Sequence, residues 1–347
     1  MKTSIKLYDY NLPEHLIADY PTKHRDESKL MIFDEKKSIK HTIFKDLFNH
    51  LQKGDLLVLN DTKVIPGRLF LKKETGGEVE LLFHKSLSSQ IAICIFGSSR
   101  KLTLNSRLYV NDNDFFVINN IEKNYVTISC NKNVMDIFIK NGEVPLPKYI
   151  KRKATKDDID RYQTTYAENQ GSVAAPTAGL HFTENIIHQL KEKGVLIQYL
   201  TLHVTYNTFK PLSSDDYSEH EIGSEYCQIK DSLMKTIKKV KSSNKKIIAV
   251  GTTATRALEN YATKGITGDY EGEADLYITP GYNFKIIDGL ITNFHLPQST
   301  LLLLVASLIG REKLLELYKQ AIDNNYRFHS YGDSMLIKAW YEVFTRI

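Results

Sequence analysis

The pattern of predicted strands and helices changes twice along the chain, near Val64 and near Val144, and these two changes constrain the fold more than any other feature of the sequence. Between them, short strand-like runs separated by turn residues occupy 64–71, 78–84, 91–96, 107–110, 115–118 and 125–130. On both sides, apolar strand-like runs alternate with helical segments, and strands are predicted at 55–62, 196–202, 246–250 and 276–278. We therefore expect an α/β fold: a discontinuous domain of residues 1–63 and 148–347, with a small antiparallel β-barrel domain, 64–147, inserted in it.

Composition narrows the class of protein. With 347 residues, 42% of them hydrophobic and 25% charged, the chain is typical of globular proteins, and its net charge of +5 permits a polyanionic partner without requiring one. Three cysteines without ligand-type spacing argue against a disulfide framework and against a metal site. The N-terminus lacks an apolar signal core, and the longest apolar run, 300–309, is too short to span a bilayer, so we expect a buried helix there and a cytoplasmic protein.

A loop at 171–183 has the composition of a ligand site. Gly171, Ser172, Thr177 and Gly179 lie among other small residues around one imidazole, His181, directly before a predicted helix. Small residues let the backbone approach a ligand, and the two glycines are expected to use backbone angles that other residues avoid. A tight turn that packs a helix on a sheet would have the same composition, so this segment alone leaves both interpretations open.

Two other strand ends carry polar residues. A buried strand passes through Gly251, Thr252 and Thr253 into a helix, whose free N–H groups suit an anion, although the lysine of a P-loop is missing and a simple capped helix is the alternative. Asn293 and His295 follow a second apolar strand, where ligands of α/β sheets collect. The segment 326–335 is also rich in aromatic and polar groups, as a site or a packed surface hairpin would be.

The basic residues form two clusters. Six lysines at 235–246 are typical of the solvated face of an amphipathic helix. The cluster at 148–156 lies at a domain junction beside tyrosines and is the better candidate for binding a nucleic-acid backbone. Its candidate contacts are Lys148, Tyr149, Lys151, Arg152 and Lys153.

Taken together, the motifs resemble one family, the S-adenosylmethionine:tRNA ribosyltransferase-isomerases of queuosine biosynthesis. The likeness includes Gly-Asp-Leu-Leu-Val-Leu-Asn-Asp-Thr at 54–62, the loop 171–183, Gly-Thr-Thr at 251–253, Thr-Asn-Phe-His-Leu-Pro at 292–297 and Ser-Tyr-Gly-Asp at 330–333. Nearly the whole chain is covered, because further matches lie at 8–13, 142–147, 160–164, 201–204 and 280–282. The resemblance also implies an α/β domain carrying an inserted β-barrel.

The resemblance implies a reaction and a set of site residues. The enzyme would transfer the ribosyl part of S-adenosylmethionine onto 7-aminomethyl-7-deazaguanine at the tRNA wobble position, giving epoxyqueuosine and releasing adenine and methionine. S-adenosylmethionine is then a consumed substrate, and no cofactor is expected. Because the sulfonium acidifies the adjacent carbon, the protein needs chiefly a base and groups that orient the reactants. The expected catalytic residues are His181 and His295, supported by Asp61, Tyr331 and Asp333; those expected to hold S-adenosylmethionine are Gly171, Ser172, Thr177, Gly251, Thr252, Thr253 and Asn293.

The chain departs from the family pattern in two places. Thr205 and Asn207 stand where the family has glycines, and Gly223 stands where it has a second histidine. Three other functions remain open: a conventional methyltransferase, which lacks its glycine-rich fingerprint here, a non-catalytic tRNA-binding protein, and a sugar-phosphate or nucleotide enzyme. A monomer is expected, because the sequence contains no coiled-coil seam.

Overall fold

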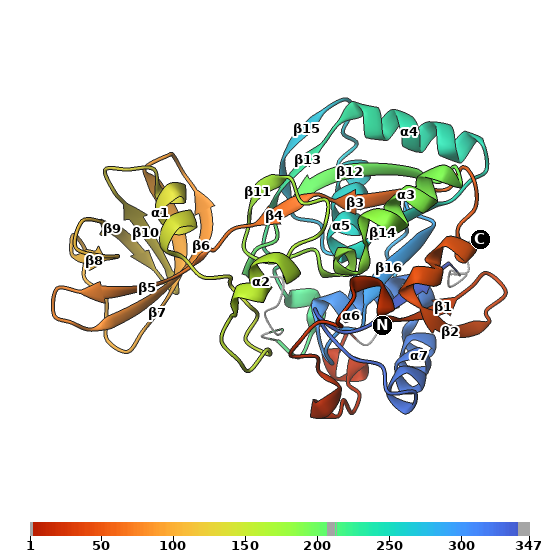
Figure 1. Cartoon of the computed structure of the whole chain (residues 1–347), viewed down its shortest axis with the longest axis horizontal. Coiled ribbons are helices and arrows are strands. Elements are labelled where there is room, and N and C mark those ends of the chain that lie inside the picture. Colours follow the sequence, from red (N-terminus) through yellow and green to blue (C-terminus); the bar gives the residue numbers. More distant parts are fainter. Residues whose placement is uncertain (1–2, 207–211, 213, 339–347) are drawn as a thin grey trace. The chain divides into compact units, whose positions relative to one another are not determined.

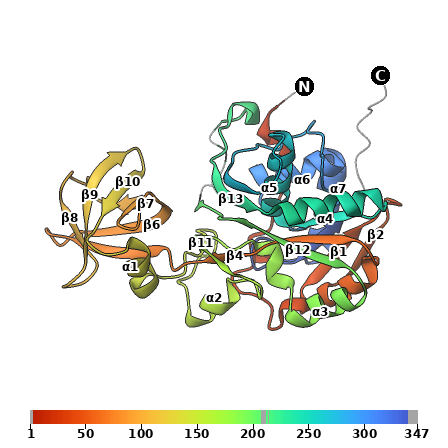
Figure 2. The ribbon, with the colours of Figure 1, turned by 90° about the horizontal axis from the view of Figure 1, so that it is seen from above.

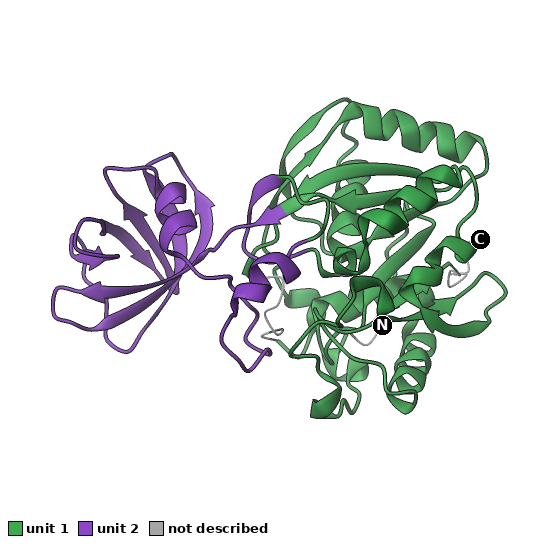
Figure 3. Cartoon of the chain, viewed as in Figure 1, with its two compact units in different colours: residues 1–62, 164–168, 176–347 green, residues 63–163, 169–175 purple. Residues whose placement is uncertain are grey.

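The chain forms two compact units (Figure 3). The structure is a computed structural model that describes residues 3–206, 212 and 214–338. The α/β unit comprises residues 1–62, 164–168 and 176–347, and the barrel unit comprises residues 63–163 and 169–175. The barrel unit thus takes in the basic segment 148–156, which lies beyond the last residue of the predicted insertion, Pro147.

One sheet organises the α/β unit. Within the described residues it has nine strands in the order β15-β13-β12-β3-β14-β16-β17-β1-β2. Four neighbours, β12, β3, β14 and β16, run parallel, so their carboxyl ends meet at one edge. The strands are β1 (Lys29–Phe33), β2 (Ile39–Ile43), β3 (Leu56–Asn60), β12 (Leu196–Leu202), β13 (Glu225–Ile229), β14 (Ile247–Val250), β15 (Tyr270–Ala274), β16 (Gly289–Asn293) and β17 (Ser334–Ile337).

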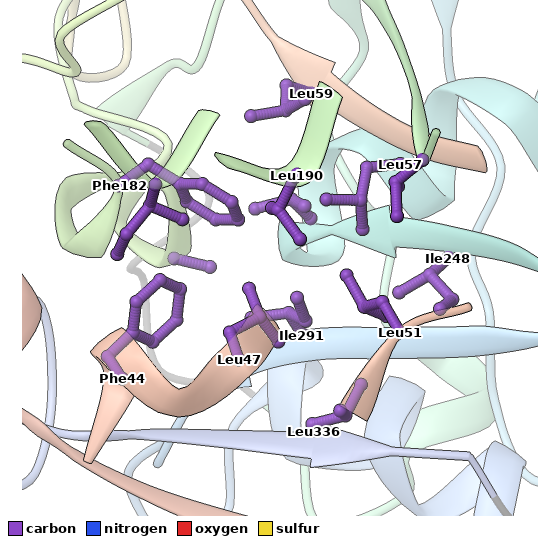
Figure 4. Packing of buried hydrophobic residues seen from close by; sticks show 14 of the residues in the cluster. Phe44, Leu47, Leu51, Leu57, Leu59, Phe182, Leu190, Ile248, Ile291 and Leu336 are labelled. Carbon is purple, nitrogen blue, oxygen red and sulfur yellow. The ribbon is translucent and has the colours of Figure 1, made fainter. Parts of the chain in front are cut away.

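Helices cover both faces of this sheet. The figures show α3 (Glu184–Glu192) on one side and α4 (Asp231–Ser242), α5 (Gly251–Thr263) and α6 (Thr300–Ile309) on the other (Figures 1 and 2). On the α3 side, Leu57 and Leu59 of β3 pack against Phe44 and Leu47 of the 3₁₀ helix η4 (Phe44–His50) and against Leu190 of α3 (Figure 4). The apolar residues of β3 are completely buried, as a strand covered on both faces requires.

Local sequence explains how these helices begin and end. Thr183 caps α3 by accepting a hydrogen bond from the Ile186 N–H, and Gly194, at a φ of 86°, follows the end of the helix. The apolar run 300–309 is the buried helix α6, which is followed by α7 (Arg311–Asp323). In the part of the chain that the structure describes, every helix is too short or too polar to cross a membrane.

The strand predicted at 276–278 is wrong. The edge strand is β15, and it ends at Ala274. The Arg256 side chain explains the exit from the sheet, because its Nε donates to the Leu276 carbonyl at 3.0 Å and its Nη2 to the Ala274 carbonyl at 2.8 Å. Two carbonyls are therefore bound by a buried guanidinium, which an apolar run in the sequence does not reveal.

The barrel unit confirms the predicted β-rich block. Its closed barrel has the strand order β10-β7-β6-β5-β8-β9, and all of these pairs are antiparallel. Phe138 of α1 (Val134–Asn141) contacts the rings of Phe83 and Phe116 inside it. The remaining elements are β4 (Thr62–Val64), β5 (Arg68–Lys73), β6 (Glu78–Ser86), β7 (Ile91–Ser98), β8 (Arg107–Tyr109), β9 (Phe115–Glu122), β10 (Tyr125–Ser129), α2 (Lys156–Arg161) and β11 (Asn169–Ser172).

Candidate active site

Polar side chains gather where the parallel strands of the α/β unit end. We call this group the polar edge; it consists of Asn60, Asp61, Thr201, Thr253 and Asn293. All five are at least nine-tenths buried. Asn60 joins strands β3 and β12 to helix α5: its amide nitrogen donates to the Leu202 carbonyl at 2.9 Å and to Thr253 Oγ1 at 3.3 Å, and its oxygen accepts from the Leu202 N–H at 3.0 Å. Asn60 was not among the predicted site residues, although it stands in the motif at 54–62.

Asp61 brings a carboxyl group to the polar edge. Its Oδ1 accepts a hydrogen bond from Thr201 Oγ1 at 2.7 Å. Next to it along the chain, Thr62 Oγ1 lies 2.7 Å from Nδ1 of His203, a ring that stacks on Tyr226. Burial lowers the pKa of His203 to about 4, so this imidazole is neutral at neutral pH. His203 is a second functional candidate that the sequence analysis missed.

His181 is held from both sides by the protein. Its Nδ1 lies 2.7 Å from Ser28 Oγ, and its Nε2 lies 3.3 Å from the Asn293 amide nitrogen. Since Thr177 Oγ1 donates to Asn293 Oδ1 at 2.9 Å, that amide is oriented with its N–H toward the imidazole, and Nε2 is the acceptor. Burial, followed by the charges of Arg327 and Arg25, lowers the His181 pKa to about 3. Thr177, His181 and Asn293, all predicted, therefore form one buried network.

His295 has a different environment. Its Nε2 lies 2.8 Å from Thr292 Oγ1, and its backbone N–H donates to the Tyr318 hydroxyl at 3.0 Å. Tyr10 donates from its hydroxyl to the His295 carbonyl. Burial lowers the pKa of this histidine to about 3. Among the described residues no hydrogen bond reaches its Nδ1.

The two predicted residues of the C-terminal segment organise its backbone. The Asp333 carboxylate accepts from the Lys29 N–H at 2.8 Å and from the Arg327 N–H at 2.7 Å, and burial raises the pKa of this carboxyl. The Tyr331 carbonyl accepts from the Arg327 guanidinium. A Cβ at Gly332 would lie 2.4 Å from the Arg327 carbonyl oxygen, so the turn accepts only glycine. Both residues hold a tight turn in place, which is a structural task.

The glycines of the loop 171–183 do different things. Gly171 has a φ of 149° and uses its freedom as predicted, whereas Gly179 has an ordinary φ, and that part of the prediction is wrong. Gly179 is required for close approach instead, because a Cβ there would lie 2.1 Å from the Tyr166 hydroxyl. Gly171 and Ser172 belong to the barrel unit, where Ser172 Oγ donates to the Ala174 carbonyl at 2.7 Å.

The basic segment 148–156 also belongs to the barrel unit. Lys148, Lys151 and Lys153 are exposed, and Tyr149 is half-buried. Arg152 is committed to the fold, because its guanidinium holds the buried Asp158 carboxylate through two hydrogen bonds of 2.7 and 2.8 Å. The lysines are therefore better placed than Arg152 to meet a phosphate backbone.

Comparisons with known proteins decide the family. The model of the queuosine biosynthesis protein family matches residues 5–337. The chain belongs to this family. The S-adenosylmethionine:tRNA ribosyltransferase-isomerase of Sulfurihydrogenibium sp. is 46% identical to it, over 95% of this chain and 98% of the relative. The S-adenosylmethionine:tRNA ribosyltransferase-isomerase of Halothermothrix orenii is 45% identical, over 96% of this chain and 99% of the relative. The expected enzyme class, a transferase and isomerase of queuosine biosynthesis, is confirmed.

A solved structure supports the fold of this queuosine biosynthesis protein. The crystal structure of the S-adenosylmethionine tRNA ribosyltransferase of Thermotoga maritima is 33% identical, covers 95% of this chain and 99% of its own, and superposes with a TM-score of 0.56. The expected combination of an α/β architecture with an antiparallel β-barrel is therefore confirmed.

The two departures from the family pattern lie beside a buried ion pair. Arg256 Nη1 donates to Glu225 Oε2 at 2.8 Å, and the two side chains are 8% and 2% exposed. Glu225 Oε1 accepts from the Thr205 N–H at 2.7 Å, and the Gly223 carbonyl accepts from Arg256. Gly223 is thus held through a backbone group that any residue carries. Thr205 is held through its backbone N–H and also through its hydroxyl, which donates to Glu225 Oε1 at 3.4 Å, whereas Asn207 lies outside the described residues. Within the described part of the chain, no group of three or more His, Cys, Asp or Glu side chains is arranged to hold a metal ion.

Proposed function

We propose that this enzyme transfers the ribosyl moiety of S-adenosylmethionine onto the aminomethyl group of 7-aminomethyl-7-deazaguanine at the wobble position of tRNA. The sugar rearranges to the epoxycyclopentanediol of epoxyqueuosine, and adenine and methionine leave. S-adenosylmethionine is a substrate consumed in each turnover, and we propose that no other cofactor takes part. We also propose that the enzyme works as a monomer in the cytoplasm.

The polar edge is the observation that carries this proposal. The chain aligns with ribosyltransferase-isomerases over 95% of its length, and in the same chain buried hydrogen-bonding groups meet at the carboxyl ends of β3, β12, β14 and β16. In α/β sheets this edge is where ligands bind. We expect such an edge to bind a small molecule with several polar groups, such as S-adenosylmethionine, in preference to the flat surface of a macromolecule.

We assign different tasks to the two predicted histidines. His295 is the candidate base, because its Nδ1 has no hydrogen bond within the described residues, and its low pKa leaves the ring neutral and able to accept a proton. His181 is a positioning residue, because Ser28 and Asn293 occupy both of its ring nitrogens. The sulfonium already acidifies the neighbouring C–H bond, so even a weakly basic imidazole is useful when it is held in place.

The residues proposed to hold S-adenosylmethionine differ in what their side chains still offer. Thr177 gives its hydroxyl to Asn293, and the Thr253 hydroxyl accepts from Asn60. The Thr252 hydroxyl makes no hydrogen bond within the described residues. Gly251, at a φ of 90°, lets the chain turn from β14 directly into α5. We propose that Lys148, Tyr149, Lys151 and Lys153 contact the tRNA. Arg152 contributes indirectly to the same site, because its guanidinium holds Asp158 and so stabilises the segment.

The proposal is tested with S-adenosylmethionine and tRNA that bears the 7-aminomethyl-7-deazaguanine base, with liquid chromatography of the small products. We expect adenine and methionine in equal amounts, and neither with unmodified tRNA. Formation of S-adenosylhomocysteine would instead identify a methyltransferase, since its product keeps the adenine. Binding of the modified tRNA without release of adenine would favour a non-catalytic RNA-binding protein, and binding of free nucleotides without RNA would favour a nucleotide enzyme.

A further inference from the structure

A pocket of the α/β unit lies where two helices begin. Thr252 in the first turn of α5 and Thr300, the first residue of α6, both line it. Tyr277, in the segment that leaves the sheet after β15, forms another part of the lining. Apolar side chains that include Leu276, Ile278 and Leu304 complete the walls. We call this the α5–α6 pocket.

The hydroxyls of this pocket lack protein partners. Thr252 and Thr300 are each only 8% exposed, and within the described residues neither hydroxyl forms a hydrogen bond. The Tyr277 hydroxyl is buried and is also without a hydrogen-bond partner in that part of the chain. Leaving a buried polar group unsatisfied is unfavourable, because the group loses its hydrogen bonds to water and gains none in return. The Tyr277 hydroxyl is such a group, and the nearby hydroxyls of Thr252 and Thr300 also form no hydrogen bond within the described residues, which together indicate that a ligand binds here.

The two helix starts add unpaired amides of positive character. The N-cap of α5 is Val250, whose side chain cannot cap, so within the described part of the chain the first N–H groups of this 13-residue helix find no acceptor in the helix itself or in its N-cap side chain. In α6, Ser299 caps only the Leu302 N–H. The start of a helix carries about half a positive charge, so a pocket at two such starts favours an anionic group.

The formal charges at the pocket balance. Glu225 and Arg256 both line it and form the buried ion pair described above. The lining therefore contributes no net charge from this pair, and attraction for an anion comes from the helix amides and the hydroxyls.

We propose that the α5–α6 pocket binds the methionine part of S-adenosylmethionine, with the carboxylate at the helix starts and the methylene chain against the apolar wall. This inference rests on the proposed function. The carboxylate is the one anionic group of S-adenosylmethionine, and adenine and ribose have none to offer. A tRNA phosphate is anionic too, but it has no apolar chain to cover Leu276, Ile278 and Leu304.

The test compares S-adenosylmethionine with its decarboxylated analogue, which differs only by the loss of the carboxylate. Dissociation constants are measured by calorimetry with and without unmodified tRNA, which supplies no reacting amine. The wild-type enzyme should bind the analogue at least about tenfold more weakly, because hydrogen bonds to a charged group are lost. Thr252→Val and Thr300→Val keep the side-chain shape and should reduce this preference to about threefold or less. Thr263→Val, an exposed position at the other end of α5, is the matched control and should keep the full preference.

Two outcomes would overturn the proposal. The first is equal affinity of the wild-type enzyme for both compounds, and the second is a loss of affinity in Thr252→Val that is the same for both, which would place another part of the substrate at the hydroxyl. Failure of the proposed function is a separate result: the wild-type enzyme would release no adenine from S-adenosylmethionine and modified tRNA, whatever its preference for the carboxylate.

Discussion

His181 and His295 are both buried, and both imidazoles are neutral at neutral pH, yet their ring nitrogens differ in what they can still do. The nitrogens of His181 face Ser28 and Asn293, so this ring belongs to the internal network of the protein. His295 is fixed through Nε2 and its backbone, and its Nδ1 is without a hydrogen bond in the described residues. Only a ring nitrogen that has no hydrogen bond within the protein, as Nδ1 of His295 has none in the described residues, can accept a proton from a substrate.

His295→Gln should lower turnover by at least about a hundredfold, because loss of a general base costs about 10²–10⁴ in rate. Glutamine retains a polar group for Thr292, so the melting temperature should change by only a few degrees, roughly the effect of 1 kcal/mol or less. Adenine release per enzyme measures the first effect and thermal unfolding the second. Near-normal adenine release by a folded His295→Gln enzyme would exclude this residue as the base.

His181→Ala is the informative comparison. It leaves Ser28 and Asn293 without a shared partner and opens a cavity beside Phe44, so it should destabilise the fold by about 2–4 kcal/mol in chemical denaturation. If His181→Ala were as stable as the wild type, the positioning role argued for this ring would be wrong.

At the scale of residues, the sequence identified three residues that share one hydrogen-bond network, but not the partners of most others. Thr177, His181 and Asn293 lie in recognisable motifs and meet in one network. Long-range pairing decided the rest: Asn60 binds Leu202, Thr205 binds Glu225, and Gly179 faces Tyr166, in each case across a separation that a motif does not encode. A sequence motif identifies the residue, whereas its partner depends on the fold.

Cationic side chains of the segment 148–156 and of helix α4 differ in whether they are exposed to solvent or bound within the fold. In the segment 148–156 the lysines are exposed, while Arg152 is bound to Asp158, which joins the capping box that starts α2. On α4, the apolar face formed by Leu233, Ile237 and Val240 is buried, and the lysines occupy the opposite face, as is usual in an amphipathic helix. Exposure alone therefore does not separate an RNA contact from a solvated helix face.

Replacing Lys151 and Lys153 together with alanine should weaken tRNA binding and make it less dependent on salt. Each phosphate contact that is lost removes about 0.7–0.9 from the slope of log K against log salt concentration, so the double variant should lose about 1.4–1.8. Binding isotherms at several salt concentrations give the slope.

The control for this prediction is Lys235→Ala with Lys238→Ala on α4, which should leave the slope unchanged. An equal fall in both double variants would show that the cations act through overall charge and not as a site. Unaltered binding in the Lys151 and Lys153 variant would remove this segment from the tRNA-binding surface.

At the scale of elements, periodicity predicted most of the fold. The barrel strands, β12, β14, α3 and α6 follow from alternating or continuous apolar runs and from caps such as Thr183. The failure at 276–278 has a cause outside the segment, since Arg256 binds the Leu276 carbonyl. Strand β13 carries Glu225 in a buried position, and a charged residue there hides a strand from a search for apolar runs.

The whole molecule buries several imidazoles, and this makes its stability depend on pH. Burial is the main cause that lowers the pKa of His181, His295 and His329 to about 3 in the folded protein. In the unfolded chain a histidine has a pKa of about 6.5. The unfolded state therefore takes up protons first as the pH falls, so the stability is complete above about pH 6.5 and decreases toward pH 3.

His329→Asn tests this linkage. One fewer buried histidine should make the fall in unfolding free energy between pH 6 and pH 4.5 shallower by about 1 kcal/mol per pH unit. Asparagine is chosen because residue 329 has a φ of 73°, which asparagine tolerates. Asp333 acts in the opposite sense, since burial raises its pKa, but it is present in both proteins and cancels in the comparison. An identical pH slope for the two proteins would contradict the argument.

The position of the barrel unit in the chain also has a kinetic meaning. Strands β3 and β12 are direct neighbours in the sheet, with Leu56 opposite Leu196, yet the whole inserted unit lies between them in the sequence. A ribosome must complete the barrel before the centre of the sheet can close, and a folded insertion shortens the chain loop that this closure has to order. The barrel therefore also assists assembly: defects in it should delay the folding of the α/β unit even where they leave the finished protein intact.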